Sequence, residues 1–221
     1  MKNMAKKKLT IVHTTLATVS MITTEINTMY PNCFRIVNFM DDSMLNDIKE
    51  AGNITKEVIE RFVQYVIIAK QNKSDAILLA CSSIGQAGDL ARKILDIPLY
   101  KIDEPMACEA VKGRKILVLG TVPSTLKPTG DLIRSKLISN DQCINIHLIP
   151  EIFQYAATDK DRHDAAIAEV VDANADAYDT IVLAQASMSG AVRFVKQTKA
   201  RVLTSIPTGL NQLHELIGGE D

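Results

Sequence analysis

Short runs of Val, Ile and Leu alternate along the chain with longer segments in which apolar residues recur every three or four positions. The short runs have the length and composition of buried parallel strands, whereas the longer spacing is typical of helices with one apolar face. In residues 56–71, for example, Val58, Phe62, Val66 and Ala69 fall on one such face. The pattern predicts an α/β protein with parallel sheets.

Eight strands and seven helices follow from this pattern. The strands are predicted at Leu9–Thr14, Phe34–Phe39, Ala76–Ala80, Leu99–Ile102, Lys115–Thr121, Ile144–Ile149, Thr180–Gln185 and Arg201–Thr204. The helices are predicted at Lys56–Gln71, Gln86–Leu95, Pro105–Lys112, Ser124–Lys136, Asp161–Tyr178, Gly190–Gln197 and Pro207–Ile217. The threonine-rich stretch after the first strand is expected to be a loop, and Asp159–Asp161 to cap the fifth helix.

Two segments of the chain resemble each other closely. Asp75–Ile84 and Asp179–Met188 align without gaps and are identical at five of ten positions. Lys8–His13 and Lys115–Gly120 match in the same order along the chain. Generic buried strands also look alike, but the consistent spacing of several segments favours an internal duplication.

The duplication predicts two pseudo-symmetric, Rossmann- or flavodoxin-like α/β domains with parallel sheets. The first domain is predicted to comprise residues 1–106 together with 206–221, and the second residues 107–205. Ligands of open parallel sheets bind beyond the carboxyl ends of the strands, and domain interfaces favour pockets. We therefore expect the active site in the cleft between the two domains.

The composition excludes several classes of protein. Lys and Arg number 25 against 26 Asp and Glu, and the chain has no Trp, so a nucleic-acid partner is not expected. No run approaches the ~18 uncharged apolar residues of a membrane span. The uncharged segment after the basic start carries His13 and several threonines, which is poor material for a signal peptide. The chain is expected to be soluble and cytoplasmic.

Metal and nucleotide sites find no support in the sequence. The four cysteines at 33, 81, 108 and 143 form no CxxC pair, and the four histidines are scattered. Walker and dinucleotide motifs are missing, and Asp41 with Asp42 is expected in a solvated turn. We expect no metal and no cofactor.

Cys81 is the strongest candidate for chemistry. It follows a predicted buried strand directly and precedes Ser82 and Ser83, which are natural N-caps for the next helix. The positive end of that helix would lower the pKa of the thiol toward thiolate and make Cys81 the most reactive cysteine. The alternative is a buried, inert thiol, as expected for the other three cysteines.

Three motifs in this order resemble the aspartate/glutamate/hydantoin racemase superfamily. The motifs are Ala80–Ser83, Gly120–Thr125 and Leu183–Met188. The resemblance covers nearly the whole chain and implies two similar domains, a last helix that returns to the first domain, cofactor-independent chemistry and a small carboxylic acid as substrate. Homodimers are common in the family. Each half typically supplies one cysteine, one thiolate removing the α-proton and the other thiol reprotonating the opposite face.

The chain departs from this pattern at Gln185, which the repeat aligns with Cys81. An amide side chain forms hydrogen bonds but transfers no proton at neutral pH. Cys81 could pair with another acid, for which His13 is the first candidate. Cys81 could also protonate an enediolate alone, as in arylmalonate-type decarboxylases, or add to a double bond, as in maleate isomerases. A catalytically inactive two-lobed binding or regulatory protein is the non-enzymatic alternative.

An enediolate-like transition state needs hydrogen-bond donors aimed at its developing charge. Hydroxyl side chains near the predicted strand ends are candidates for this role, although each could instead be a cap or turn residue. These substrate-binding candidates are Thr14, Thr15, Ser82, Ser83, Thr121, Ser124, Thr125 and Ser187. Together with these residues, the resemblance implies a cofactor-independent racemase or isomerase of a small carboxylic acid such as an amino acid, with decarboxylation as the alternative reaction.

Overall fold

The computed structural model describes residues 6–196 and 198–218. Gln197, the last residue of the sixth predicted helix, lies outside it, as do residues 1–5 and 219–221 of the first predicted domain. The chain divides into two compact units, residues 1–102 with 209–221 (unit 1) and residues 103–208 (unit 2). Each unit contains a four-stranded parallel sheet, ordered β2-β1-β3-β4 in unit 1 and β6-β5-β7-β8 in unit 2. The prediction of an α/β fold with two parallel sheets is confirmed.

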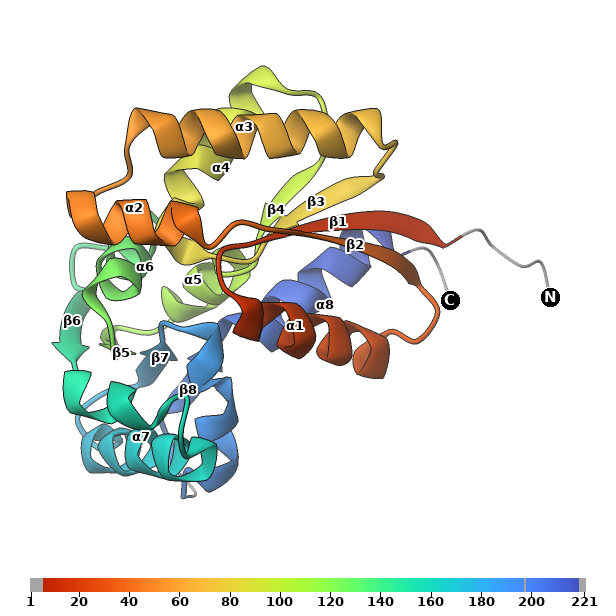
Figure 1. The fold of residues 1–221 in the computed structure, drawn as a ribbon. Helices are drawn as coiled ribbons and strands as arrows, with labels where there is room; N and C mark the ends of the chain where they lie inside the picture. Colours follow the sequence, from red (N-terminus) through yellow and green to blue (C-terminus); the bar gives the residue numbers. More distant parts are fainter. Residues whose placement is uncertain (1–5, 197, 219–221) are drawn as a thin grey trace. The chain divides into compact units, whose positions relative to one another are not determined.

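Unit 1 packs helices on both faces of its sheet (Figure 1). Its strands are β1 (Lys7–His13), β2 (Phe34–Met40), β3 (Ala76–Leu79) and β4 (Leu99–Lys101). Its helices are α1 (Leu16–Met29), α2 (Ser43–Ala51), α3 (Lys56–Gln71), the 3₁₀ turn η1 (Ser82–Ile84), α4 (Gly85–Ile94) and most of α8 (Ser205–Ile217). The apolar faces of α2, α3 and α4 share one buried core with β1, β3 and β4, with Phe62 of α3 as its largest side chain.

Unit 2 repeats this arrangement with fewer long helices. Its strands are β5 (Lys115–Gly120), β6 (Cys143–Leu148), β7 (Thr180–Leu183) and β8 (Arg201–Thr204). Its helical segments are α5 (Glu104–Ala110), α6 (Pro123–Ser135), η2 (Pro150–Tyr155), α7 (Lys160–Asn174) and η3 (Ala186–Phe194). One core joins α5 and α6 to the sheet, and a second joins α7, η2 and η3 to its other face.

The hydrogen-bond register of the two sheets confirms the internal duplication. Val12 of β1 pairs with Leu79, and Leu119 of β5 pairs with Leu183. One position further along, the amide of Ala80 donates to the carbonyl of Val12 over 3.0 Å. In the same way, the amide of Ala184 donates to the carbonyl of Leu119 over 2.9 Å. These pairs make Cys81 and Gln185 equivalent positions, each two residues after the end of its strand.

Two helices of unit 1 were not predicted. The threonine-rich stretch expected as a loop is helix α1, in which Ile22 and Ile26 lie one turn apart and are buried. Helix α2 likewise buries Met44 and Ile48. Burial of a few apolar residues outweighs the modest helix propensity of threonine, because packing supplies most of the stability of a short helix.

The last predicted helix of unit 2 is also different in the structure. The segment expected as a helix from Gly190 is the end of η3, which has 3₁₀ geometry over Ala186–Phe194. It packs tightly against α7: a Cβ added at Gly190 would lie 2.1 Å from Asp164 Oδ2. The acidic cap of α7 is confirmed at Asp159, whose side chain accepts a hydrogen bond from the amide of Arg162.

Candidate active site

Cys81 lies at the carboxyl edge of the unit 1 sheet. Strand β3 ends at Leu79, the amide of Ala80 still bonds to Val12, and Cys81 follows in an extended conformation. Thr14 follows β1 at the same edge, because β1 and β3 are adjacent parallel strands. This edge is where catalytic and binding groups gather in open α/β sheets.

Four hydrogen bonds converge on the Cys81 sulfur. They come from the Thr14 hydroxyl, from the amide and hydroxyl of Ser83, and from the amide of Ile84. Burial nevertheless raises the pKa of the Cys81 thiol more than these donors lower it. The side chain is set deep among protein groups but is still partly exposed. Cys81 therefore rests as a neutral thiol within reach of a small ligand.

The expected lowering of the Cys81 pKa is thus wrong. The turn η1 separates Cys81 from α4, which begins only at Gly85. The amides of Ser83 and Ile84, just before α4, still donate to the sulfur and lower the pKa of the thiol, but burial raises it by more. Ser82 and Ser83 do not cap α4 either: the residue before α4 is Ile84, with no side-chain cap bond. Instead, Ser83 is buried beside the thiol.

The other cysteines are more exposed than the sequence suggested. Cys108 and Cys143 are exposed and Cys33 is partly exposed, so their expected placement in the core is wrong. Cys108 lies on the outer side of the short helix α5, and Cys143 begins the edge strand β6. None of the four cysteines forms a disulfide within the described residues.

Iodoacetamide should therefore modify Cys108 and Cys143 before Cys81 at pH 7. Alkylation requires the thiolate, and a raised pKa keeps Cys81 protonated while the other two thiols face solvent. Raising the pH should narrow the difference, because the Cys81 thiol ionises only above the ordinary range. Peptide mass spectrometry over a time course at pH 7 and pH 9 measures this order. Modification of Cys81 ahead of Cys108 at pH 7 would contradict the neutral-thiol assignment.

His13 ends β1 and is fully buried. Its Nδ1 lies 3.0 Å from the Thr18 hydroxyl and its Nε2 lies 3.1 Å from Asn38 Oδ1. Burial lowers the pKa of His13, and the bond to Asn38 raises it by less, so the ring is neutral at pH 7. With both nitrogens engaged inside unit 1, these contacts favour a structural role over that of a second acid.

The equivalent edge of unit 2 carries Gln185 and Thr121. The Oε1 atom of Gln185 accepts hydrogen bonds from the amide of Thr121 at 2.6 Å and from its hydroxyl at 3.0 Å. Thr121 is buried directly after β5, whereas Gln185 is partly exposed and lies two residues after the end of β7. This threonine therefore occupies the same place relative to Gln185 as Thr14 does relative to Cys81.

The remaining hydroxyl candidates are less closely tied to either residue. Thr15 precedes α1 without making a side-chain cap bond, and Ser82 begins η1. Ser124 and Thr125 lie in the first turn of α6. Ser187 lies in η3, and its carbonyl accepts a 2.9 Å hydrogen bond from Lys160 Nζ. The structure thus brings Thr14 and Ser83 to Cys81 and Thr121 to Gln185.

Asp41, which was expected in a solvated turn, lies at a strand end and is bonded to several protein groups. Its amide bonds to the carbonyl of His13, so it lies at the same edge of the sheet as Cys81. Burial raises the pKa of the Asp41 carboxyl. Hydrogen bonds from Ser43, Tyr65 and the amide of Met44, together with the charge of Arg61, lower this pKa by more, so the net shift is downward. Its place directly after the second strand was the available signal. Asp41 organises the start of α2 and is not a freely solvated turn residue.

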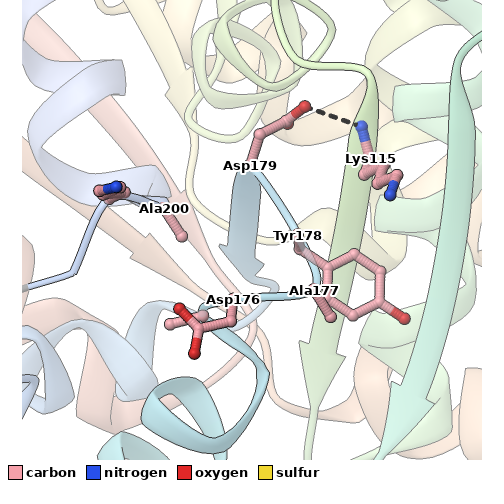
Figure 2. A pocket seen from close by; sticks show the side chains of 8 residues that line it. Lys115, Asp176, Ala177, Tyr178, Asp179 and Ala200 are labelled. Atoms are coloured by element: carbon pink, nitrogen blue, oxygen red, sulfur yellow. Dashed lines mark hydrogen bonds between the residues drawn. The ribbon is translucent and has the colours of Figure 1, made fainter.

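A surface pocket of unit 2 lies away from these candidates. Figure 2 shows this pocket of about 370 Å³, lined by residues that include Lys115, Tyr178 and Asp179. Lys115 begins β5 and Asp179 precedes β7, so the pocket lies at the amino edge of the sheet, opposite to Gln185. Asp179 Oδ2 accepts hydrogen bonds from the amides of Arg114 and Lys115 at 2.9 and 3.0 Å, which ties the two strands together. The pocket therefore has a structural carboxylate and none of the candidate groups.

No group of three or more His, Cys, Asp and Glu side chains in residues 6–196 and 198–218 is placed to hold a metal ion. Within the same residues, every helix is too short or too polar to cross a membrane.

Comparison with known proteins gives a consistent fold. The sequence model of the family described as Asp/Glu/Hydantoin racemase matches residues 11–213. Aspartate racemase from Picrophilus torridus has a similar structure, with 14% identity, a TM-score of 0.72 and coverage of 97% of this chain and 95% of that chain. An aspartate racemase homologue from Pyrococcus horikoshii OT3 is 16% identical with a TM-score of 0.69, covering 96% and 100%.

An unliganded arylmalonate decarboxylase is also similar, at 13% identity and a TM-score of 0.64, with coverage of 98% of this chain and 95% of that chain. At these identities the structural likeness shows the fold alone. Among curated proteins, no sequence matches the chain.

Proposed function

Because the chain belongs to the Asp/Glu/hydantoin racemase family, we propose that it is a cofactor-independent enzyme that transfers a proton at the carbon beside the carboxylate of a small carboxylic acid. In this proposal Cys81 is the acid/base, and racemisation or another isomerisation is the family reaction. The substrate is an amino acid or a related acid. The single observation that carries the proposal is the partly exposed Cys81 thiol at the carboxyl edge of the unit 1 sheet.

The groups around Cys81 suit this chemistry. A carbon acid beside a carboxylate passes through an enediolate-like state, and hydrogen-bond donors stabilise its negative charge. Thr15 and Ser82 supply hydroxyl groups next to this edge, while the hydroxyls of Thr14 and Ser83 donate to the Cys81 sulfur and hold it in place. A small acid is thus held without a cluster of cationic side chains, in keeping with a chain whose net charge is −1.

The resting state of the thiol favours reactions in which Cys81 first gives a proton. A raised pKa keeps the proton on sulfur at neutral pH, and the equivalent position in unit 2 is an amide that transfers none. Removal of an α-proton, in contrast, requires the thiolate at the start. This observation supports a second candidate reaction, decarboxylation of a malonate-type acid.

In that second reaction the bond from the α-carbon to one carboxylate breaks, carbon dioxide leaves, and the electron pair remains as an enediolate. The Cys81 S–H bond then breaks as its proton passes to the α-carbon. The resulting thiolate takes a proton from water and returns to its resting state, and the hydroxide that remains combines with carbon dioxide to give bicarbonate. The step is balanced with water as the only other reactant and needs no oxidant or reductant.

A screen in D₂O tests the proposed function. Purified protein is incubated with aspartate, glutamate, hydantoins, maleate and alkyl- and arylmalonates, and the products are followed by NMR and chiral chromatography. Deuterium at the α-carbon with inversion identifies a racemase, and loss of carbon dioxide with one deuterium gained identifies a decarboxylase. Conversion of maleate identifies a cis–trans isomerase. Binding of these acids without exchange or turnover would contradict the proposal and favour a binding protein.

A further inference from the structure

The side-chain amide of Gln185 has a fixed orientation. Its Oε1 atom is 2.6 Å from the backbone nitrogen of Thr121, a group that donates a hydrogen bond and cannot accept one. The oxygen of the amide, and not its nitrogen, must therefore face Thr121. The Thr121 hydroxyl adds a second bond to the same oxygen.

The nitrogen end of the amide is left available. Among residues 6–196 and 198–218, no group accepts a hydrogen bond from Gln185 Nε2. Gln185 is partly exposed and lies two residues after the end of β7, at the carboxyl edge of its sheet. The two N–H bonds of Nε2 are therefore free to donate to a ligand from a place where α/β sheets bind ligands.

In both units a threonine after the first strand donates to the residue that follows the third strand, but the acceptor differs between the units. In unit 1 the threonine after the first strand donates to a thiol at Cys81. In unit 2 the equivalent threonine donates to an amide oxygen at Gln185. A thiol can exchange a proton, whereas an amide is a neutral donor whose state does not change with pH near neutrality. Equivalent positions of the two sheets thus support proton transfer in unit 1 and hydrogen-bond donation in unit 2.

We propose that Gln185 binds a carboxylate oxygen of a small organic acid through Nε2, and that Thr121 is the positioning residue that aims it. The inference rests on the proposed function for the identity of the ligand as the substrate acid. It extends that function by giving the position after β7 a binding role in place of an acid/base role. An acid with a second carboxylate or a comparable oxygen acceptor, such as a malonate, is the class that this donor suits best.

Gln185→Glu is the sharpest test. The glutamate has nearly the same shape and can still accept both bonds from Thr121, but it presents a negatively charged acceptor in place of the donor. We expect KM for the acid to rise by about 10- to 100-fold, the range for one lost hydrogen bond to a charged group, with a smaller change in kcat. Gln154→Glu, on the exposed segment η2, adds the same charge and should leave KM unchanged.

Thr121 provides a second, independent readout. Thr121→Val removes only the hydroxyl bond to Gln185, so KM should rise less than in Gln185→Glu. Thr121→Ser keeps a hydroxyl that can donate to Gln185, so KM should stay close to the wild-type value. Melting temperatures from circular dichroism show whether each variant is folded. A rise in KM with Thr121→Val that Thr121→Ser does not reverse would indicate a packing effect and overturn the positioning role.

Binding measurements separate this inference from the proposed function. Isothermal titration of malonate, aspartate and glutamate into wild-type protein and Gln185→Glu requires no turnover. Weaker binding to Gln185→Glu supports the inference even if the wild type converts no acid. Turnover by the wild type with an unchanged KM and affinity in Gln185→Glu overturns the inference while the proposed function stands. Failure of the wild type to bind any of these acids overturns the inference as well.

Discussion

Alanine at position 81 is expected to lower kcat/KM for the substrate acid by about 10²- to 10⁴-fold, the usual contribution of a positioned acid or base. Cys81 is the thiol on which Thr14, Ser83 and Ile84 converge, and the amide at the equivalent position of unit 2 cannot take over proton transfer. The substitution removes little volume from the core. The melting temperature should therefore change far less than the activity does.

Initial rates and thermal melts of Cys81→Ala and Cys108→Ala measure this difference. Cys108 is exposed on α5 and has no place in the proposed reaction, so its substitution should leave both quantities near the wild-type values. Cys81→Ala with more than a tenth of wild-type kcat/KM would show that the proton comes from another group. His13→Ala would then be the next variant to examine.

Phe62→Ala is expected to cost about 3–5 kcal/mol of the free energy of unfolding, the range for a large aromatic residue lost from a packed core. Phe62 is fully buried among apolar residues of α2, α3, α4 and the unit 1 sheet. Cys81 packs against the same apolar core. Loss of the Phe62 side chain should also make the segment around the Cys81 thiol more mobile.

Ile68→Ala on the same helix is the matched control. Ile68 is 42% exposed, and its truncation should cost less than about 1 kcal/mol. Chemical denaturation followed by circular dichroism gives both values, with hydrogen exchange to assign the change to unit 1. Equal effects of the two substitutions would contradict the assignment of α3 as the helix that covers this core through Phe62.

The sheets were predictable from the sequence because buried strands depend on local composition. All eight predicted strands overlap the observed ones, and the repeat of Asp75–Ile84 at Asp179–Met188 indicated that the elements recur in the same order along both halves of the chain. Helix α1 was not predictable in the same way. Its threonines read as a loop, and only packing of Ile22 and Ile26 in the folded unit makes the helix favourable.

The candidate site was predictable in position but not in its electrostatics. The place of Cys81 at a strand end follows from the chain alone, and so does its equivalence to Gln185. The sign of its pKa shift depends on how deeply the folded chain buries the sulfur, because burial outweighs the hydrogen bonds from Thr14, Ser83 and Ile84. The bond network of His13 depends likewise on Asn38, a residue 25 positions away on β2.

The central claim is that Cys81 rests as a neutral thiol and acts as the proton donor. The pH dependence of kcat/KM tests it most directly, because this parameter reports the ionisation of the free enzyme. The donor form is present below the thiol pKa, and burial raises that pKa. The account therefore predicts a plateau from about pH 6.5 through neutrality and a fall only in the alkaline range, above the ordinary thiol pKa of about 8.5. Activity that instead rises with pH through neutrality, as a thiolate or a titrating His13 acting as base would require, would contradict it.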